Sequence, residues 1–197
     1  MRKLLCCVPM MILLLTACAG GPAGISEGEQ LSLTIRGEYL EATAWTAAAA
    51  VTADYGQRVY RYEMAAASTG DETTLTLSAP EEVAGITAHV DGETGAMEYD
   101  GLWVETGPLD GDGLTPVSAV PALMEVARSG YITACCLEEG AGAALLRMDC
   151  GDPEGQPGTG VETVLWFDAA THALVRGEVS VDGFRVILCE FSDFTMG

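Results

Sequence analysis

Side chains suited to catalysis or to metal binding are few in this sequence, and they lie far apart. The two histidines, His89 and His172, do not belong to an H-E-x-x-H pattern, and no G-x-S-x-G serine elbow is expected. Residues 110–113 (DGDG) match part of the spacing of a calcium loop, but the remaining ligands are missing. The acid-rich turn around Asp152 is equally incomplete. We therefore expect no enzymatic activity, no cofactor and no metal.

The clearest chemical signal is a cysteine that ends an apolar N-terminal segment. Arg2 and Lys3 precede an apolar run over residues 4–15, which is shorter than the ~20 residues of a membrane-spanning helix. A basic start and a short apolar core are typical of a secretory signal. Residues 15–18 (LTAC) resemble the bacterial lipobox, whose cysteine receives a diacylglyceryl group and becomes the first mature residue. The resemblance implies a signal peptide over 1–17 and lipidation of Cys18; an ordinary signal peptide with a chance cysteine is the alternative.

The remainder of the chain is strongly acidic. Without residues 1–17 it keeps 29 acidic and seven basic residues, a formal charge near −22. This charge argues against binding to nucleic acid and to anionic lipid head groups. Attachment to a membrane would then depend on acyl chains, such as palmitate, carried by Cys18. Residues 18–28 are small and glycine-rich after the cysteine and indicate a flexible tether. We expect a lipid-anchored protein on the extracytoplasmic side of the cell membrane.

Four cysteines remain after Cys18, and an extracytoplasmic location permits disulfides between them. They are Cys135, Cys136, Cys150 and Cys189. The adjacent pair would point to opposite faces of a strand. In a hairpin of residues 131–138 and 143–150, Cys136 would face Leu145 and Cys150 would face Tyr131, so these two would not bond to each other. Free cysteines that behave as small hydrophobic side chains are favoured, and a disulfide remains the alternative.

Two longer segments have helical patterns. Residues 29–42 fit both strand and helix spacing, and we favour a helix because the segment is long and a hairpin follows directly. Residues 116–128 repeat apolar side chains at helical spacing and end before Gly130. Residues 80–85 begin with proline and close with glycine, which predicts a turn or a single helical turn.

A long hairpin is predicted around residues 54–57 (DYGQ). In the expected register Val51 faces Tyr60 and Ala49 faces Tyr62, which places small side chains opposite aromatic ones.

Short alternating segments fill most of the remaining chain. They predict strands over 46–53, 58–65, 72–78, 87–90, 96–99, 102–106, 131–138, 143–150, 161–168, 174–181 and 184–191. The expected fold class is α+β: a curved antiparallel sheet of about ten to eleven strands, an open half-barrel, covered by two or three short helices.

This order of elements resembles the LolA/LolB-type lipoprotein carrier fold, which mycobacterial lipid-carrying lipoproteins share. The matching phrases are 51–56 (VTADYG), 80–86 (PEEVAGI), 99–101 (YDG) and 166–168 (WFD) with Thr171 and His172. The resemblance covers nearly all of residues 29–197 and implies that they form one domain.

A carrier fold implies a hydrophobic cavity between sheet and helices that holds acyl chains. The candidate lining residues on the concave face are Tyr60, Tyr62, Leu75, Leu77, Trp103, Leu123, Met124, Trp166 and Phe167. The same side chains would form an ordinary closed core if no cavity exists.

Two functions therefore remain open. In the first, the domain binds a lipid or a lipoprotein close to its own membrane, since an anchored protein cannot shuttle. In the second, it is a surface-tethered interaction or sensory module with a closed core and a protein partner.

Overall fold

The computed structural model describes residues 25–92, 94–140 and 142–197 and shows one curved, open antiparallel sheet with two α-helices. The lipobox and residues 19–24 of the expected tether lie outside this range. The predicted fold class, an α+β open half-barrel, is confirmed. The elements are α1 (Glu27–Glu41), β1 (Ala44–Asp54), β2 (Val59–Thr69), β3 (Glu72–Ala79), a 3-10 turn η1 (Glu81–Val83), β4 (Thr87–Asp91), β5 (Thr94–Tyr99), β6 (Leu102–Pro108), α2 (Pro116–Ser129), β7 (Ile132–Glu139), β8 (Ala144–Cys150), β9 (Val161–Asp168), β10 (Leu174–Val181) and β11 (Phe184–Met196).

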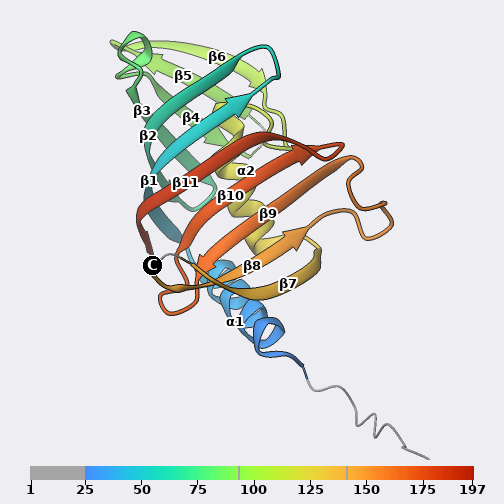
Figure 1. Ribbon diagram of the computed structural model, residues 1–197. Helices are drawn as coiled ribbons and strands as arrows, with labels where there is room; N and C mark the ends of the chain where they lie inside the picture. Colours follow the sequence, from blue (N-terminus) through green and yellow to red (C-terminus); the bar gives the residue numbers. More distant parts are fainter. Residues whose placement is uncertain (1–24, 93, 141) are drawn as a thin grey trace, which may run out of the picture.

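The strand order explains why α2 crosses the sheet. The order is β6-β5-β4-β3-β2-β1-β11-β10-β9-β8-β7, so β6 and β7 are neighbours in sequence but lie at opposite edges. The chain between them must pass over one face, and α2, about 21 Å long, spans much of that distance. Figure 1 shows α2 behind the strands and α1 beside β7 and β8. We call the face under the helices concave and the opposite face convex.

Both helices begin with a capping box, in which two side chains satisfy backbone N–H groups. The Ser26 hydroxyl accepts from the Glu29 N–H, and the Glu29 carboxylate accepts from the Ser26 N–H. This cap starts α1 at Glu27, two residues before the start expected from the sequence. Thr115 and Ser118 form the corresponding cap of α2. None of the helices that the structure describes is both long and apolar enough to cross a membrane.

The register of the β1–β2 hairpin differs from the prediction by two residues. Val51 pairs with Tyr62, not with Tyr60, and Ala49 pairs with Met64. The cause is the loop, which covers residues 55–58 because Asp54 still belongs to β1 and its carboxylate accepts from the N–H of Gly56 at 2.8 Å. A shift of two residues keeps every side chain on its predicted face, since strand side chains alternate with a period of two.

The register predicted for the β7–β8 hairpin is also wrong. Cys136 pairs with Arg147 and Cys150 with Ile132, and a bulge follows Ile132. The four cysteines at 135, 136, 150 and 189 are free, as the sequence favoured. Cys150 and Cys189 are buried, but Cys136 is exposed and therefore not the small core side chain that was expected.

The core lies between the helices and the strands from β8 through β11 to β3. Ile35 and Tyr39 of α1 are fully buried, and the Tyr39 ring meets the edge of Phe167 at 5.3 Å. Burial raises the pKa of the Tyr39 hydroxyl, which donates to the carbonyl of His172. On the other side of the core α2 packs closely on β10, where Gly177 faces Leu123.

Candidate ligand-binding site

Exposure of apolar side chains on the concave face increases from β1 to β6. One row of paired residues runs from β1 to β6 through Ala47, Ala66, Leu75, Ala88, Met97 and Val104. The first four are buried, Met97 is half-buried and Val104 is 63 % exposed. Side chains on one row of a sheet share one face, so the apolar concave surface continues beyond the part buried under the helices.

A cleft with a volume of about 400 Å³ lies along α2 on the side of these strands. Its floor is the next row of paired residues, which consists of Trp45, Ser68, Thr73 and Val90. Its wall is one face of α2, with Ser118, Pro121, Ala122, Met124, Glu125 and Arg128. The volume falls within the range of small-molecule sites, and the floor combines the apolar Trp45 and Val90 with two hydroxyl side chains.

The rim of the cleft is mainly acidic. Asp71, Asp110 and Glu125 lie on it, and Arg128 contributes the positive charge. The Arg128 guanidinium donates to the carbonyls of Tyr39 at 3.1 Å and Ala42 at 3.4 Å, so it joins the end of α2 to the end of α1. This rim disfavours a ligand with several negative charges close to the cleft.

Tyrosines gather where the β1–β2 loop meets the start of α2. The Tyr55 hydroxyl donates to the carbonyl of Leu114 at 2.9 Å, and its ring lies 6.2 Å from that of Tyr60. Partial burial, together with the neighbouring Tyr62, Asp110 and Tyr60, raises the pKa of Tyr55. The hydroxyl therefore stays protonated and keeps its hydrogen bond at neutral pH.

Seven of the nine residues proposed from the sequence as cavity lining lie on the concave face. Leu75, Leu77, Leu123, Met124 and Phe167 are buried there, whereas Tyr62 is half-buried and Tyr60 is 37 % exposed. Only Met124 of this set lines the cleft; Leu123 borders a smaller hollow beside β9 and β10. The other buried members form part of a filled core.

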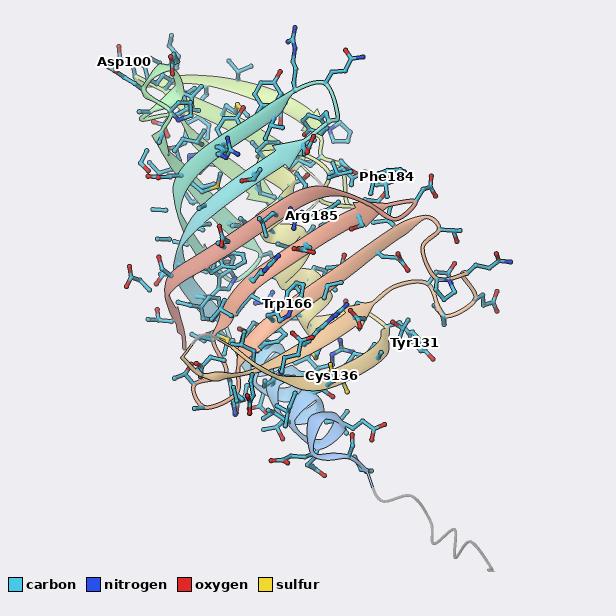
Figure 2. The ribbon with its side chains drawn as sticks, in the orientation of Figure 1. Asp100, Tyr131, Cys136, Trp166, Phe184 and Arg185 are labelled. Carbon is cyan, nitrogen blue, oxygen red and sulfur yellow. The ribbon has the colours of Figure 1, made fainter. Side chains whose placement is uncertain are left out.

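The two tryptophans in that set lie on the convex face, so their assignment to the concave lining is wrong. Trp103 stacks on His89 with ring centroids 4.5 Å apart. Trp166 lies between the guanidinium groups of Arg147, at 5.6 Å, and Arg176, at 4.8 Å, and its indole N–H donates to Glu138. Figure 2 shows Trp166 and Arg185 on the face turned away from α2.

Both histidines contact carboxylates of neighbouring elements. His89 lies on the convex face with one ring nitrogen 3.3 Å from Glu72 and the other 3.3 Å from Glu98. His172, in the β9–β10 turn, lies 2.7 Å from Glu38 of α1. Both contacts join neighbouring elements, and His172 therefore helps to hold α1 on the sheet.

Other reactive groups also have structural roles or are unreactive. Residues 24–28 read G-x-S-x-G, but Ser26 is the cap of α1. The Asp110 carboxylate accepts from the N–H groups of Asp112 and Leu114 within its own loop. Burial raises the pKa of Cys150 to about 11 and that of Cys189 to about 12, which keeps both as unreactive thiols. Within the described ranges no group of three or more His, Cys, Asp or Glu residues is placed to hold a metal.

Sequence reasoning missed most of the cleft. Its floor residues Ser68 and Thr73 are polar, and Val90 lies in a strand of only five residues, so apolar periodicity does not select them. The feature that locates the cleft is α2, which connects β6 and β7 at opposite edges of the sheet. The sequence alone does not give the strand order, so it could not place α2 over this face.

Comparison with known proteins gives similarity in structure and none in sequence. No protein-family model matches the sequence, and no curated protein matches it. An uncharacterized conserved protein from Thermus thermophilus is similar in structure with a TM-score of 0.51 and 10% identity, over 85% of this chain and 86% of that one. LprF from Mycobacterium bovis has a TM-score of 0.44 and 15% identity, with 85% and 92% covered. A LolA superfamily protein from Nitrosomonas europaea has a TM-score of 0.40 and 11% identity, with 86% and 93% covered. The first similarity shows the fold alone, and the other two are weaker.

Proposed function

We propose that this chain is a membrane-anchored extracytoplasmic lipoprotein that binds the acyl chain of a lipid in the cleft along α2. The observation that carries the proposal is the continuity of the cleft with apolar concave surface that stays exposed. The cleft floor ends at Val90, and Met97, Leu102 and Val104 extend the same face to the edge of the sheet. An acyl chain lying there would remove this apolar surface from water.

The anchor is the second part of the proposal and rests on the N-terminal sequence. Cys18 in the lipobox-like stretch would carry the lipid, and residues 1–17 would be removed. The acidic rim of the cleft supports a ligand whose head group is neutral or carries positive charge. An anchored protein of this kind would hold or present a lipid within reach of its own membrane.

A surface-tethered interaction module with a closed core is the alternative function. The filled core beneath β8–β11 favours it, as does the convex cluster of Trp166 with Arg147 and Arg176, because tryptophan and arginine are enriched at protein interfaces. The two functions differ in one measurable property, which is the affinity of the cleft for an acyl chain.

Binding of a monoacylglycerol with a fluorescent acyl chain, whose head group is neutral, to protein that lacks residues 1–18 tests the proposal. Pro121 faces the cleft from inside α2, so Pro121→Phe restores a helical N–H group and places a ring in the cleft. We expect Pro121→Phe to weaken binding at least about tenfold, or ~1.4 kcal/mol. The matched variant Pro121→Ala gains the same N–H group without filling the cleft and should bind like the unsubstituted protein.

Absence of binding by the unsubstituted protein would contradict the proposal and favour the interaction module. Equal binding by Pro121→Phe and Pro121→Ala would show that the monoacylglycerol binds elsewhere.

A further inference from the structure

Two hydroxyl side chains lie side by side in the floor of the cleft. Ser68 of β2 and Thr73 of β3 are direct partners in the register of these strands, and we call their side chains the floor hydroxyls. Directly opposed residues of an antiparallel pair have Cα atoms about 4.5–5.5 Å apart, so one ligand atom can contact both hydroxyls. Ser68 is 6 % exposed and Thr73 7 %, and both line the cleft.

Other opposed hydroxyls of this sheet form hydrogen bonds with each other. The hydroxyls of Thr46 and Thr195 lie 2.8 Å apart, and those of Thr76 and Thr87 lie 3.2 Å apart. The floor hydroxyls, in contrast, have no hydrogen-bond partner within residues 25–92, 94–140 and 142–197. A hydroxyl inside a protein costs free energy unless water or a ligand satisfies it. The floor of the cleft therefore has unused capacity for hydrogen bonds.

A ligand that covers the floor hydroxyls must replace the water that reaches them. A plain hydrocarbon chain offers no acceptor, so it would leave both hydroxyls unsatisfied. An oxygen atom of the ligand at the same place can accept from both. A site of this kind discriminates strongly against a ligand that lacks the matching polar group.

The charges around the floor indicate which kind of oxygen fits. Asp71, Asp110 and Glu125 line the cleft, and a carboxylate or phosphate placed between them would be repelled. The guanidinium of Arg128 donates to two carbonyls at the end of α1 and does not leave the cleft cationic. The matching group is therefore a neutral acceptor, such as the carbonyl of an ester.

We propose that Ser68 and Thr73 bind the ester carbonyl of a neutral acyl ester and so select the class of lipid that the cleft takes. This inference rests on the proposed function and deepens it, because it concerns the same cleft.

The position of the floor hydroxyls also gives the bound lipid a direction. The row of paired floor residues begins at Trp45 on β1 and ends at Val90 on β4. From Thr73 the acyl chain would pass over Val90 toward β6, which lies three strand spacings, or about 14 Å, away. The head group would lie toward Trp45 and the C-terminal end of α2, where Glu125 and Arg128 form a polar rim.

Binding of two matched lipids to the full chain tests the proposal. The first is a monoacylglycerol with a fluorescent acyl chain, and the second is a 1-O-alkylglycerol with the same chain, which lacks the ester carbonyl. We expect the unsubstituted protein to bind the ester about tenfold more tightly than the ether, because only the ester satisfies both floor hydroxyls. The double variant Ser68→Ala/Thr73→Val removes both hydroxyls and should bind the two lipids equally.

Two further variants are the controls. Thr73→Ser keeps a hydroxyl at this position and should retain the preference for the ester. Thr74→Val removes the hydroxyl of the next residue on β3, which lies on the convex face, and should retain the preference as well. The quantity compared is the ratio of the two dissociation constants within each variant, because a change in stability affects both lipids alike.

The possible failures of the two proposals can be told apart. Equal binding of ester and ether by the unsubstituted protein would overturn this inference and leave the acyl-chain function standing. A double variant that still prefers the ester would also overturn it, because other groups would then bind the carbonyl. Binding of neither lipid would contradict the proposed function and this inference together.

Discussion

The two halves of the sheet bury their concave faces to very different extents. In the half formed by β7–β11, a row from Cys189 through Gly177, Leu165 and Met148 is buried throughout and ends at the half-buried Cys135. In the half formed by β1–β6, the row from Ala47 begins buried at β1 and ends exposed at Val104 of β6. This row ends on β4, β5 and β6, which are 5, 6 and 7 residues long, and the elements that cover the sheet account for the rest of the difference.

The covering helices explain this difference. Helix α1 contacts β7 and β8, and α2 contacts β1, β4, β9 and β11. Glycine and alanine on the concave face allow α2 to approach the middle of the sheet, as at Gly177 and at Ala47 and Ala49 of β1. The β7–β11 half is therefore built for stability, and the β1–β6 half leaves apolar surface available for binding.

The largest expected effect contrasts a core residue with an exposed one. Phe167→Ala removes a fully buried ring that packs on Tyr39, and we expect a loss of about 3–5 kcal/mol in the free energy of unfolding. Leu102→Ala, at a side chain 72 % exposed on β6, should change it by less than about 0.5 kcal/mol. Urea unfolding followed by circular dichroism measures both. Similar losses in the two variants would show that the β6 face is covered in solution.

A smaller effect is expected from two glycines on the concave face. A methyl group added at Gly177 would lie 2.6 Å from the buried Leu123, and overpacking of this kind costs about 1–3 kcal/mol. A methyl group at Gly95 would lie 2.7 Å from the hydroxyl of Thr106 and 3.0 Å from Leu109, which are less buried and can move. Thermal unfolding should show a clear decrease in Tm for Gly177→Ala and a smaller one for Gly95→Ala. The reverse order would contradict the difference in packing between the halves.

The smallest effect concerns the turn that holds α1 on the β7–β11 half. The Asp168 carboxylate accepts from the backbone N–H groups of Thr171 and Ala170, and these hydrogen bonds lower its pKa. A lowered pKa adds stability above pH ~4, and this stability is lost as the pH falls through the folded-state value. Asp168→Ala should cost about 1 kcal/mol at pH 7. Asp168→Asn keeps an acceptor oxygen and should lose only the part of the free energy of unfolding that depends on pH. Unfolding measured at pH 7 and at pH 3 separates this part from the rest.

The alternation of side chains predicted the elements of this fold well but could not determine all of its pairings. All eleven strands and both helices are present near their expected positions, because apolar and polar residues alternate in segments such as Glu72–Ala79. Next to their loops the two hairpin registers were wrong by two residues, and beyond the bulge in β7 the difference at Cys150 is one residue. The cause next to the loops is that the first residue of a four-residue loop can also end a strand. Asp54 does so, and its hydrogen bond to Gly56 is a local detail that periodicity does not encode.

The face of a strand was unpredictable where apolar residues are consecutive. Leu102-Trp103-Val104 and Leu165-Trp166-Phe167 each place apolar side chains on both faces, so nothing in the pattern assigns the tryptophans to the convex side. Trp166 is stabilised there by Arg147 and Arg176, which come from neighbouring strands and become visible only with the register. The cleft was likewise hidden, because it depends on where α2 crosses the sheet.

Hydrogen–deuterium exchange of the full chain, with and without a saturating monoacylglycerol, tests most directly whether the exposed concave surface binds an apolar ligand. We predict slower exchange in α2 and in β4–β6 when the monoacylglycerol is bound, with β9 and β10 unchanged. Protection confined to β7–β11, or no protection anywhere, would contradict the assignment of binding to the β1–β6 half.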